Sequence, residues 1–344
     1  MSRIERLRGS LEEPLLVTAP ANVLYLTGFH SSNAALLVEA ERVRLFTDFR
    51  YADAARSVGG VEPVETKRAL FTSLAELLEG KIAFEADAVT YAAYRTLADA
   101  GLDLVPRRGI VEALRAVKDA QELALITHAS EIADAAFADL LEEPWIGRTE
   151  RELAWRLEQH LHERGAEKPA FPSIVAAGPN SARPHAEPGE RVIEADQLVI
   201  VDWGATVGGY SSDCTRTVAT GDLPDELARA YEVCLDAQLA AVAGVRAGVG
   251  GMEADGIARE RIATAGFGEA FGHGLGHGVG LLVHEAPRLS TESADTLVPG
   301  NVVTIEPGIY LEGFGGVRIE DLAVVREDGV DVLTSLPKEL VTVR

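Results

Sequence analysis

Cysteine is scarce in this chain of 344 residues, where only Cys214 and Cys234 occur. A scaffold built on disulfides is therefore excluded, and so few thiols are typical of a reducing compartment, which leads us to expect a cytoplasmic location. Long apolar runs are also absent from the sequence, because no stretch reaches the ~18 residues that predict a membrane span. The charged residues Arg3, Glu5 and Arg6 near the N-terminus are unlike a signal peptide.

Basic residues are few relative to acidic ones. The chain contains 32 Lys and Arg against 54 Asp and Glu, which gives a net charge of −22. A charge of this sign argues against nucleic acid or an anionic membrane as partner. With 47% hydrophobic and 25% charged residues, the composition is that of a soluble globular protein, and disorder and collagen are excluded.

The length predicts two domains, since one domain usually contains ~100–200 residues. Residues 1–115 carry 16 acidic and 14 basic residues, whereas residues 116–344 carry 38 and 18. This change in charge places a boundary within residues 111–120. We therefore expect an N-terminal domain over 1–115 and a second domain over 116–344.

The first domain alternates short apolar runs with helical patterns, which predicts an α/β domain with a mixed or parallel sheet. Strands are predicted over 22–27, 34–38, 43–47 and 81–85, and helices over 51–58, 70–78 and 90–99. The second domain is predicted to be α+β, with antiparallel hairpins and segregated helices. Its helices are predicted over 110–141, 149–163, 225–243 and 249–265, and its strands over 197–203, 210–218, 302–310 and 317–325.

Four carboxylates interrupt the predicted strands of the second domain. They are Asp202, Asp213, Glu306 and Glu320. A carboxylate among β-branched residues is costly to bury unless it is paired or bound to a metal. Any one of them taken alone could equally occupy a bulge or an edge position.

The expected hairpin registers bring these carboxylates together in pairs. A turn between residues 207 and 208 would set Asp202 opposite Asp213, and a turn centred on residue 313 would set Glu306 opposite Glu320. Directly opposed like charges destabilise a strand pair. Two such pairs in one domain suggest a binuclear cation site.

A glycine-rich stretch supplies the fifth candidate ligand, His277. Glycine occurs at every second position from 272 to 280, a spacing that matches neither the dinucleotide-binding motif nor the P-loop. It predicts strand-like backbone at a crowded site, with His273, Leu275 and His277 on the face opposite the glycines. Three of the eight histidines, with His284 as the third, lie within twelve residues here.

The chemistry of these five ligands favours a particular group of metals. Four carboxylates and one imidazole suit Mn²⁺, Co²⁺ or Zn²⁺, and the oxygen majority favours Mn²⁺. The sequence contains no H-E-x-x-H motif and no G-x-S-x-G motif, which argues against a zincin and against a serine hydrolase.

The chain resembles the pita-bread metallopeptidases, specifically the Xaa-Pro branch that contains prolidase and aminopeptidase P. Residues 22–29 and 47–51 look like that family's creatinase-type N-terminal domain, and residues 114–122 look like the start of its catalytic domain. The resemblance covers nearly the whole chain. It implies a creatinase-like α/β domain, a pita-bread α+β domain and a homodimer in which the N-terminal domain lies near the partner's active-site mouth.

The resemblance also implies a role for each candidate residue. Two divalent ions would be bound by Asp202, Asp213, His277, Glu306 and Glu320, with Asp213 and Glu320 bridging them. Glu306 would also accept the proton of the attacking water. The remaining site residues would be His273 and His284, which stabilise the oxyanion or the leaving nitrogen, and His185 and Arg318, on the substrate side.

Several activities remain open within and beyond this family. The compact length favours an Xaa-Pro dipeptidase, which needs a positive group for the proline carboxylate, and Arg183 and Arg288 are the candidates. An aminopeptidase P, acting on longer peptides, is the alternative. A methionine aminopeptidase would lack the long N-terminal domain, and creatinase has its ligand positions substituted. A non-enzymatic binding protein on the same fold is the alternative from a different class.

Overall fold

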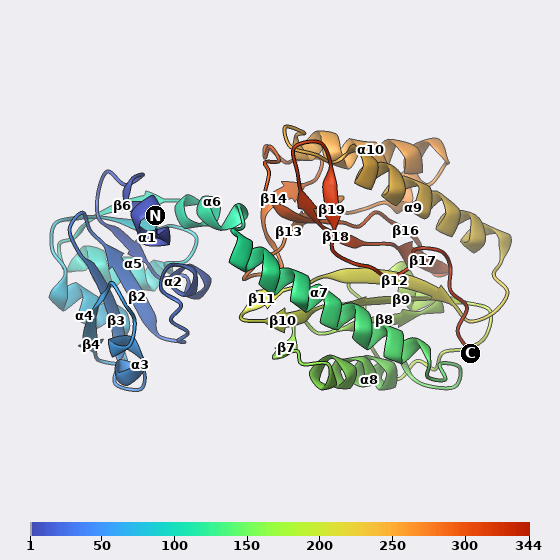
Figure 1. Ribbon diagram of the computed structural model, residues 1–344, viewed down its shortest axis with the longest axis horizontal. Helices are drawn as coiled ribbons and strands as arrows, with labels where there is room; N and C mark the ends of the chain where they lie inside the picture. The colour runs from blue at the N-terminus through green and yellow to red at the C-terminus, as the bar shows by residue number, and fades with distance from the viewer. Residues whose placement is uncertain (1) are drawn as a thin grey trace. The chain divides into compact units, whose positions relative to one another are not determined.

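The computed structural model describes residues 2–344 and divides after Arg115 into two compact units (Figure 1). None of the helices in residues 2–344 combines the length and the apolar character needed to cross a membrane. The two units are described separately below.

The first unit is built on one six-stranded sheet with the strand order β4-β3-β2-β1-β5-β6. β1 pairs antiparallel with β2 but parallel with β5, so the sheet is mixed, as predicted. Its strands are β1 (Leu15–Val17), β2 (Ala34–Val38), β3 (Val43–Asp48), β4 (Glu62–Thr66), β5 (Lys81–Glu85) and β6 (Asp103–Arg107). Its helices are α1 (Arg3–Arg8), α2 (Pro20–Thr27), α3 (Ala52–Arg56), α4 (Leu70–Leu77), α5 (Tyr91–Asp99) and α6 (Ile110–Ala116).

The strand predicted over 22–27 is wrong, because these residues lie in helix α2. Pro20 stands at the first helical position, where its fixed φ and missing N–H are tolerated. Gly28 ends the helix at φ 70° and donates its N–H to the Leu24 carbonyl. A short apolar run cannot be assigned to helix or strand by its spacing alone, and the two end signals decide the matter here.

The second unit contains two pairs of helices on opposite sides of its sheets (Figure 1). They are α7 (Ala120–Leu141) with α8 (Glu150–Glu163), and α9 (Asp225–Gly244) with α10 (Gly251–Thr264). The continuous helix predicted over 110–141 is wrong. Asp119 accepts the N–H groups of Gln121 and Glu122 and starts α7 afresh with a capping box.

The strands of the second unit form several small sheets. A three-stranded sheet has the order β12-β9-β8, a second three-stranded sheet β11-β10-β7, a five-stranded sheet β14-β13-β15-β18-β19, and β16 pairs with β17. The strands are β7 (Lys168–Pro169), β8 (Ile174–Ala177), β9 (Leu198–Trp203), β10 (Ala205–Val207), β11 (Tyr210–Ser211), β12 (Cys214–Ala219), β13 (Gly276–Gly278), β14 (Glu285–Leu289), β15 (Val302–Ile305), β16 (Gly308–Leu311), β17 (Gly315–Arg318), β18 (Asp321–Val325) and β19 (Val330–Val332).

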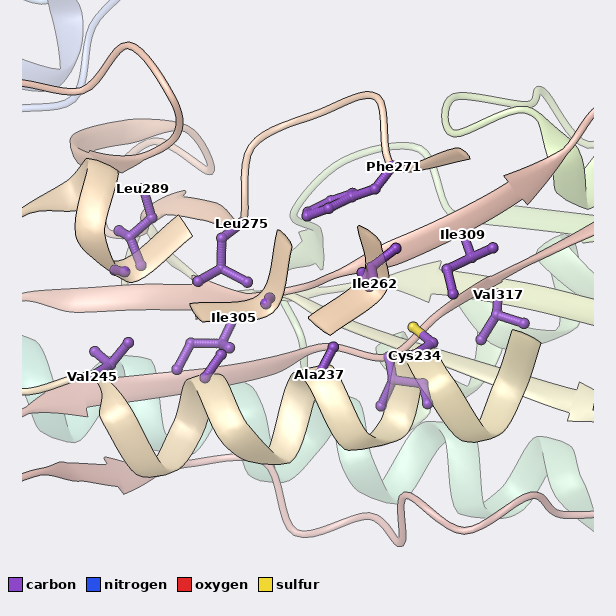
Figure 2. Close-up of a cluster of buried hydrophobic side chains, with 14 of the residues drawn as sticks. Cys234, Ala237, Val245, Ile262, Phe271, Leu275, Leu289, Ile305, Ile309 and Val317 are labelled. Carbon is purple, nitrogen blue, oxygen red and sulfur yellow. The ribbon is translucent and has the colours of Figure 1, made fainter. Parts of the chain in front are cut away.

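Each pair of helices has its own apolar core. The core below α7 and α8 includes Phe137 and Trp203, whose rings stack with 4.3 Å between centroids. The core below α9 and α10 includes Ala237, Ile305 and Ile309, as Figure 2 shows. The strands that carry the candidate site therefore lie between the two apolar cores and pack against both.

Three predicted strands are each split into two at a candidate ligand. Asp213 lies between β11 and β12, Glu306 between β15 and β16, and Glu320 between β17 and β18. At each break the chain passes from one sheet to another. Because a broken ladder frees the side chain from strict alternation, carboxylates from different sheets can converge on one point.

One of the two predicted hairpin registers is correct. The hairpin centred on Gly313 pairs Gly308 with Arg318, which is the predicted register. The earlier hairpin is shifted by two residues, so that Asp202 lies opposite Thr215 and not opposite Asp213. Residues 208 and 209 are both glycines with positive φ, and such a pair forms the two-residue turn itself.

Candidate metal centre

Three carboxylates from different strands converge in the second unit. Asp202, Asp213 and Glu320 each offer an oxygen, and these oxygens lie within 4.8 Å of one another. Burial raises the pKa of Asp213 and of Glu320 well above the ordinary range, and the neighbouring carboxylates raise them further. A bound cation would remove both effects, because it favours the ionised carboxylates.

Two of these carboxylates have one oxygen bound by the protein and one that is unpaired. Glu320 Oε2 accepts a hydrogen bond from the Thr215 hydroxyl at 2.7 Å, and Asp202 Oδ2 accepts one from Arg318 Nη2 at 2.6 Å. Glu320 Oε1 and Asp202 Oδ1 are buried without a hydrogen-bond partner. A buried unpaired carboxylate oxygen is costly, so this pattern fits a cation.

His277 is oriented to offer Nε2 to the same region. Its Nδ1 lies 3.1 Å from the Gly278 carbonyl, which can only accept, so Nδ1 carries the proton. Its Nε2 lies 3.2 Å from Glu306 Oε1 and 3.7 Å from Asp213 Oδ2. A histidine whose other ring nitrogen donates to a carbonyl has the arrangement usual for a metal ligand.

Glu306 completes the group of five. Burial alone would raise the pKa of its carboxyl, but the hydrogen bond and charge of His277 lower it to about 2. The same interaction raises the pKa of His277, although burial opposes this. The Thr304 hydroxyl donates to Glu306 Oε1 at 2.9 Å and accepts the His277 N–H at 3.0 Å. Thr304 therefore fixes the position of both neighbours.

A chain of hydrogen bonds connects His273 to Asp202. His273 Nδ1 lies 2.8 Å from the Gly274 carbonyl and its Nε2 lies 2.8 Å from the Tyr310 hydroxyl. Burial lowers the pKa of His273, so the ring is neutral at neutral pH and, with its proton on Nδ1 toward Gly274, accepts at Nε2 from the Tyr310 hydroxyl. That hydroxyl accepts in turn from Arg318 Nη1 at 2.9 Å.

The two other predicted histidines are exposed. His284 lies with its ring centroid 4.2 Å from that of His277, and burial and the nearby His277 charge lower its pKa. His185 follows a 3-10 turn and lies close enough to His273 and His284 to affect the pKa of each. Glu285, next to His284, forms an ion pair with the buried Lys118 at 2.8 Å.

Sequence reasoning missed the three hydroxyl residues of the site. Tyr310, Thr304 and Thr215 donate to His273, Glu306 and Glu320 respectively. The strand period of two carried a signal, since Thr215 and Thr304 lie two residues from a candidate ligand and Tyr310 lies four residues from Glu306.

The residues present fit a pair of divalent cations. The site combines four buried or half-buried carboxylates with one imidazole, the ligand chemistry that hard and borderline divalent ions prefer. Residues 124–327 match metallopeptidase family M24, and residues 3–117 match the creatinase/prolidase N-terminal domain. The chain belongs to metallopeptidase family M24.

Relatives of this M24 metallopeptidase include proteins with stated activities. The chain is 34% identical over 346 residues to the Xaa-Pro dipeptidase of Pyrococcus furiosus, with 98% of this chain and 99% of the relative covered. The solved structure of an Xaa-Pro dipeptidase from Bacillus anthracis has a TM-score of 0.95 and 39% identity, with 99% of each chain covered.

An X-Pro aminopeptidase structure from Thermotoga maritima has a TM-score of 0.89 and 36% identity, with 99% of this chain and 100% of that one covered. The matches confirm the predicted combination of a creatinase-type N-terminal domain with a pita-bread catalytic domain. They also confirm that the chain is a metallopeptidase.

Proposed function

We propose that this M24 metallopeptidase is a metal-dependent Xaa-Pro dipeptidase, which hydrolyses proline-containing dipeptides at the bond before proline. The observation that carries the proposal is the convergence of buried carboxylates with two unpaired oxygens at Asp202 and Glu320. The Xaa-Pro dipeptidases among its relatives supply the substrate class. All five ligand positions retain a ligating residue, which argues against a non-enzymatic binding protein on this fold.

The proposed cofactor is a pair of divalent ions. Mn²⁺ suits the carboxylate majority best, with Co²⁺ or Zn²⁺ as alternatives. The residues that would bind them are Asp202, Asp213, His277, Glu306 and Glu320. When bound, such ions supply Lewis acidity for the scissile carbonyl and a water nucleophile at neutral pH.

Glu306 is the proposed acceptor of the water proton. Its lowered pKa keeps the carboxyl ionised at neutral pH, which is the state that a proton acceptor requires. Thr304 Oγ1 donates to Glu306 Oε1, so the direction of that oxygen is set before substrate arrives.

His284 and His273 are the proposed stabilisers of the oxyanion or of the leaving nitrogen. No hydrogen bond from the described residues uses either ring nitrogen of His284, so it is available to donate to substrate. His273 instead has both ring nitrogens bound within the protein, to Gly274 and to Tyr310. We assign the oxyanion contact to His284, and we assign to His273 a fixed neutral ring on the leaving-group side.

His185 and Arg318 are the proposed residues of the proline side. The Xaa-Pro bond lacks an N–H, so recognition depends on shape and on charge at the ends of the dipeptide. Arg318 is 3% exposed, and its Nη1 donates to the Pro184 carbonyl at 3.2 Å. Arg318 therefore acts on this side by fixing the backbone beside His185.

Arg288 is the proposed partner of the dipeptide's carboxylate. It lies opposite His277 in the β13–β14 ladder, and opposed residues of a ladder point to the same face. Among the described residues its guanidinium has no hydrogen bond or ion pair, and the same is true of the exposed Arg183. Arg288 is preferred over Arg183 because its position opposite His277 places its side chain on the same face of the sheet as that candidate metal ligand.

Three further expectations concern the whole molecule. We propose that the domains are residues 1–115 and 116–344, that the protein is a cytoplasmic homodimer, and that the partner's N-terminal domain limits substrate length. Light scattering at working concentration tests the dimer, and a fully active monomer would contradict it.

Turnover of Ala-Pro and Ala-Pro-Ala by the Mn²⁺-loaded protein tests the proposed function. A dipeptidase hydrolyses Ala-Pro and is poor on Ala-Pro-Ala, because the proline carboxylate is then replaced by a peptide bond. Equal or faster turnover of Ala-Pro-Ala would identify the alternative, an Xaa-Pro aminopeptidase like the Thermotoga maritima protein. Turnover of neither peptide would refute both.

A further inference from the structure

A short loop over residues 271–275 carries His273. Its two ends are anchored by Phe271, 3% exposed, and Leu275, fully buried. Figure 2 shows both side chains against the apolar core while the chain arches between them. Gly272 in the arch is exposed, and a Cβ there would meet nothing within 4 Å. Apolar packing fixes the ends of the loop, and Gly274 lies so close to Leu289 and Ser290 that a Cβ there would collide with both. The carbonyl groups of Phe271 and His273 still need polar partners.

An ion pair on helix α10 supplies these polar contacts. Arg259 donates from Nη1 to the Phe271 carbonyl at 2.9 Å and from Nη2 to the His273 carbonyl at 2.6 Å. Its guanidinium also lies 4.3 Å from the centroid of the Phe271 ring. Charge-assisted hydrogen bonds from a planar guanidinium give direction as well as strength.

Asp255 orients this guanidinium and reaches the loop itself. It accepts from Arg259 Nε at 2.6 Å and from Arg259 Nη2 at 2.9 Å, and the aspartate is 1% exposed. Its Oδ1 also accepts the Leu275 N–H at 2.9 Å. The pair therefore contacts the loop backbone at three alternate residues, 271, 273 and 275.

The effect of the pair extends toward the metal ligands. The Leu275 carbonyl accepts the Glu306 N–H at 2.8 Å, so a shift of the Leu275 backbone would also move the backbone of Glu306. His277 is fixed separately, through its N–H to Thr304 and its place in strand β13. Loss of the pair should therefore displace His273 first and leave His277 in place.

We propose that Arg259 and Asp255 are positioning residues, which set the backbone of residues 271–275 so that His273 faces the reacting bond. The role of His273 in this statement rests on the proposed function. Neither positioning residue touches substrate, and their effect passes through the backbone of the loop. The same helix offers a matched control in Arg261, which is half exposed and pairs on the surface with Asp236.

The first experiment measures amide exchange in metal-free protein, independently of activity. In Arg259→Gln, exchange of the Leu275 amide should become faster by about tenfold or more, because Asp255, which accepts this N–H, loses the guanidinium that orients it. Arg261→Gln should leave it unchanged. Equal protection in Arg259→Gln and in the unaltered protein would overturn the inference.

The second experiment measures kinetics on Ala-Pro with Mn²⁺. Arg259→Gln should lower kcat by about 10²-fold, as small displacements of a reacting group do, with KM and Mn²⁺ stoichiometry kept. Arg259→Lys should recover part of the loss, since an ammonium group can make some of these hydrogen bonds but cannot make all the contacts of the planar guanidinium at once. Unchanged kcat beside faster exchange would overturn the inference, as would an equal loss in Arg261→Gln.

Should Arg259→Gln not fold, Asp255→Asn replaces it. The asparagine oxygen can still accept the Leu275 N–H, while its amide group cannot accept from Arg259, so the ion pair alone is removed. The same rise in exchange of the Leu275 amide is expected, and its absence counts against the proposal. If the unaltered protein fails to hydrolyse Ala-Pro, the proposed function fails, whereas the exchange measurement still decides the placement of the loop.

Discussion

Arg318 Nη2 donates to Asp202 Oδ2 at 2.6 Å, while Asp202 Oδ1 is buried without a partner. The arginine thus fixes one oxygen of a carboxylate that lies beside Asp213 and Glu320, and leaves the other oxygen without a protein partner. Residues that orient metal ligands are part of a metal site, because they fix the ligand before the ion arrives.

Substitution of Arg318 is therefore predicted to weaken metal binding. Arg318→Lys should lower Mn²⁺ affinity about 10–100-fold, because an ammonium cannot contact Asp202, Tyr310 and Thr215 together. Calorimetric titration of metal-free protein measures this. Arg326→Gln is the control, since Arg326 forms an exposed pair with Asp331. Equal affinity in Arg318→Lys and the unaltered protein would contradict the prediction.

Removal of the metal is predicted to abolish activity and lower the melting temperature. Asp213 and Glu320 are buried beside other carboxylates, so a bound cation stabilises the folded protein by an amount that grows with the logarithm of its concentration. Dialysis against a chelator followed by Mn²⁺ or Co²⁺ should restore both turnover and thermal stability. Undiminished turnover in a sample verified as metal-free would contradict the proposal that a binuclear metal site carries the activity.

The candidate ligands were accessible to sequence reasoning because each is a carboxylate in an apolar run or a histidine among glycines. The later hairpin register also followed from Gly313. The first register did not, since the residues of a two-residue glycine turn cannot be told from their neighbours without the backbone angles. A shift of two residues preserves the facing of every side chain, so the ligands still pointed inward.

The contacts that complete the site are of longer range. Arg259 lies on helix α10, and nothing in its own helical pattern indicates that it contacts the carbonyl of His273. Arg216 is a similar case, because it lies on β12 and pairs with the buried Asp321. Such contacts depend on how separate elements pack, and one sequence without its fold does not contain that information.

Substitution of Arg288 is predicted to affect dipeptides more than longer peptides. Arg288→Gln should raise KM for Ala-Pro by an amount equivalent to about 1.5–3 kcal/mol, the value of a hydrogen bond to a charged group. KM for an Ala-Pro amide, which lacks the carboxylate, should change little. Arg183→Gln serves as the control. A larger rise in KM for Ala-Pro in Arg183→Gln than in Arg288→Gln would show that Arg183, and not Arg288, binds the substrate carboxylate.

Glu143 is predicted to contribute to the acid sensitivity of the fold. The Arg156 hydrogen bond lowers its pKa below the ordinary 4.5, although burial opposes this, and His160 lowers it further. A group with a lowered folded pKa stabilises the protein above its unfolded pKa and loses this effect as pH falls through the folded value. The contribution should be about 1 kcal/mol, because Arg156 is 36% exposed.

The test compares melting temperatures of metal-free Glu143→Gln and the unaltered protein. The variant should melt lower at neutral pH, and the two should converge as pH falls below the ordinary carboxyl pKa of 4.5. Glu131→Gln, at an exposed position on helix α7, should show no such convergence. A difference between Glu143→Gln and the unaltered protein that stays constant with pH would show that the carboxylate charge is not responsible.

His284 and His277 are predicted to differ in what their removal costs. His284→Ala should keep the metals and lower kcat by about 10²–10³-fold, the usual cost of losing one donor to an oxyanion. His277→Ala should weaken metal binding directly, because its Nε2 lies beside Glu306 and Asp213. The two rings lie with centroids 4.2 Å apart, so position alone does not separate their roles.

Metal stoichiometry, melting temperature and kcat measured on both variants distinguish the possibilities. If His284 is only a packed residue, its removal lowers the melting temperature and leaves kcat of the folded protein nearly intact. Its exposure and its unpaired ring nitrogens among the described residues argue against that outcome. Equal metal loss in both variants would show that His284 also binds metal. His273 would then be the residue that contacts the oxyanion. For this contact, the hydrogen bond between its Nε2 and the Tyr310 hydroxyl would first have to break.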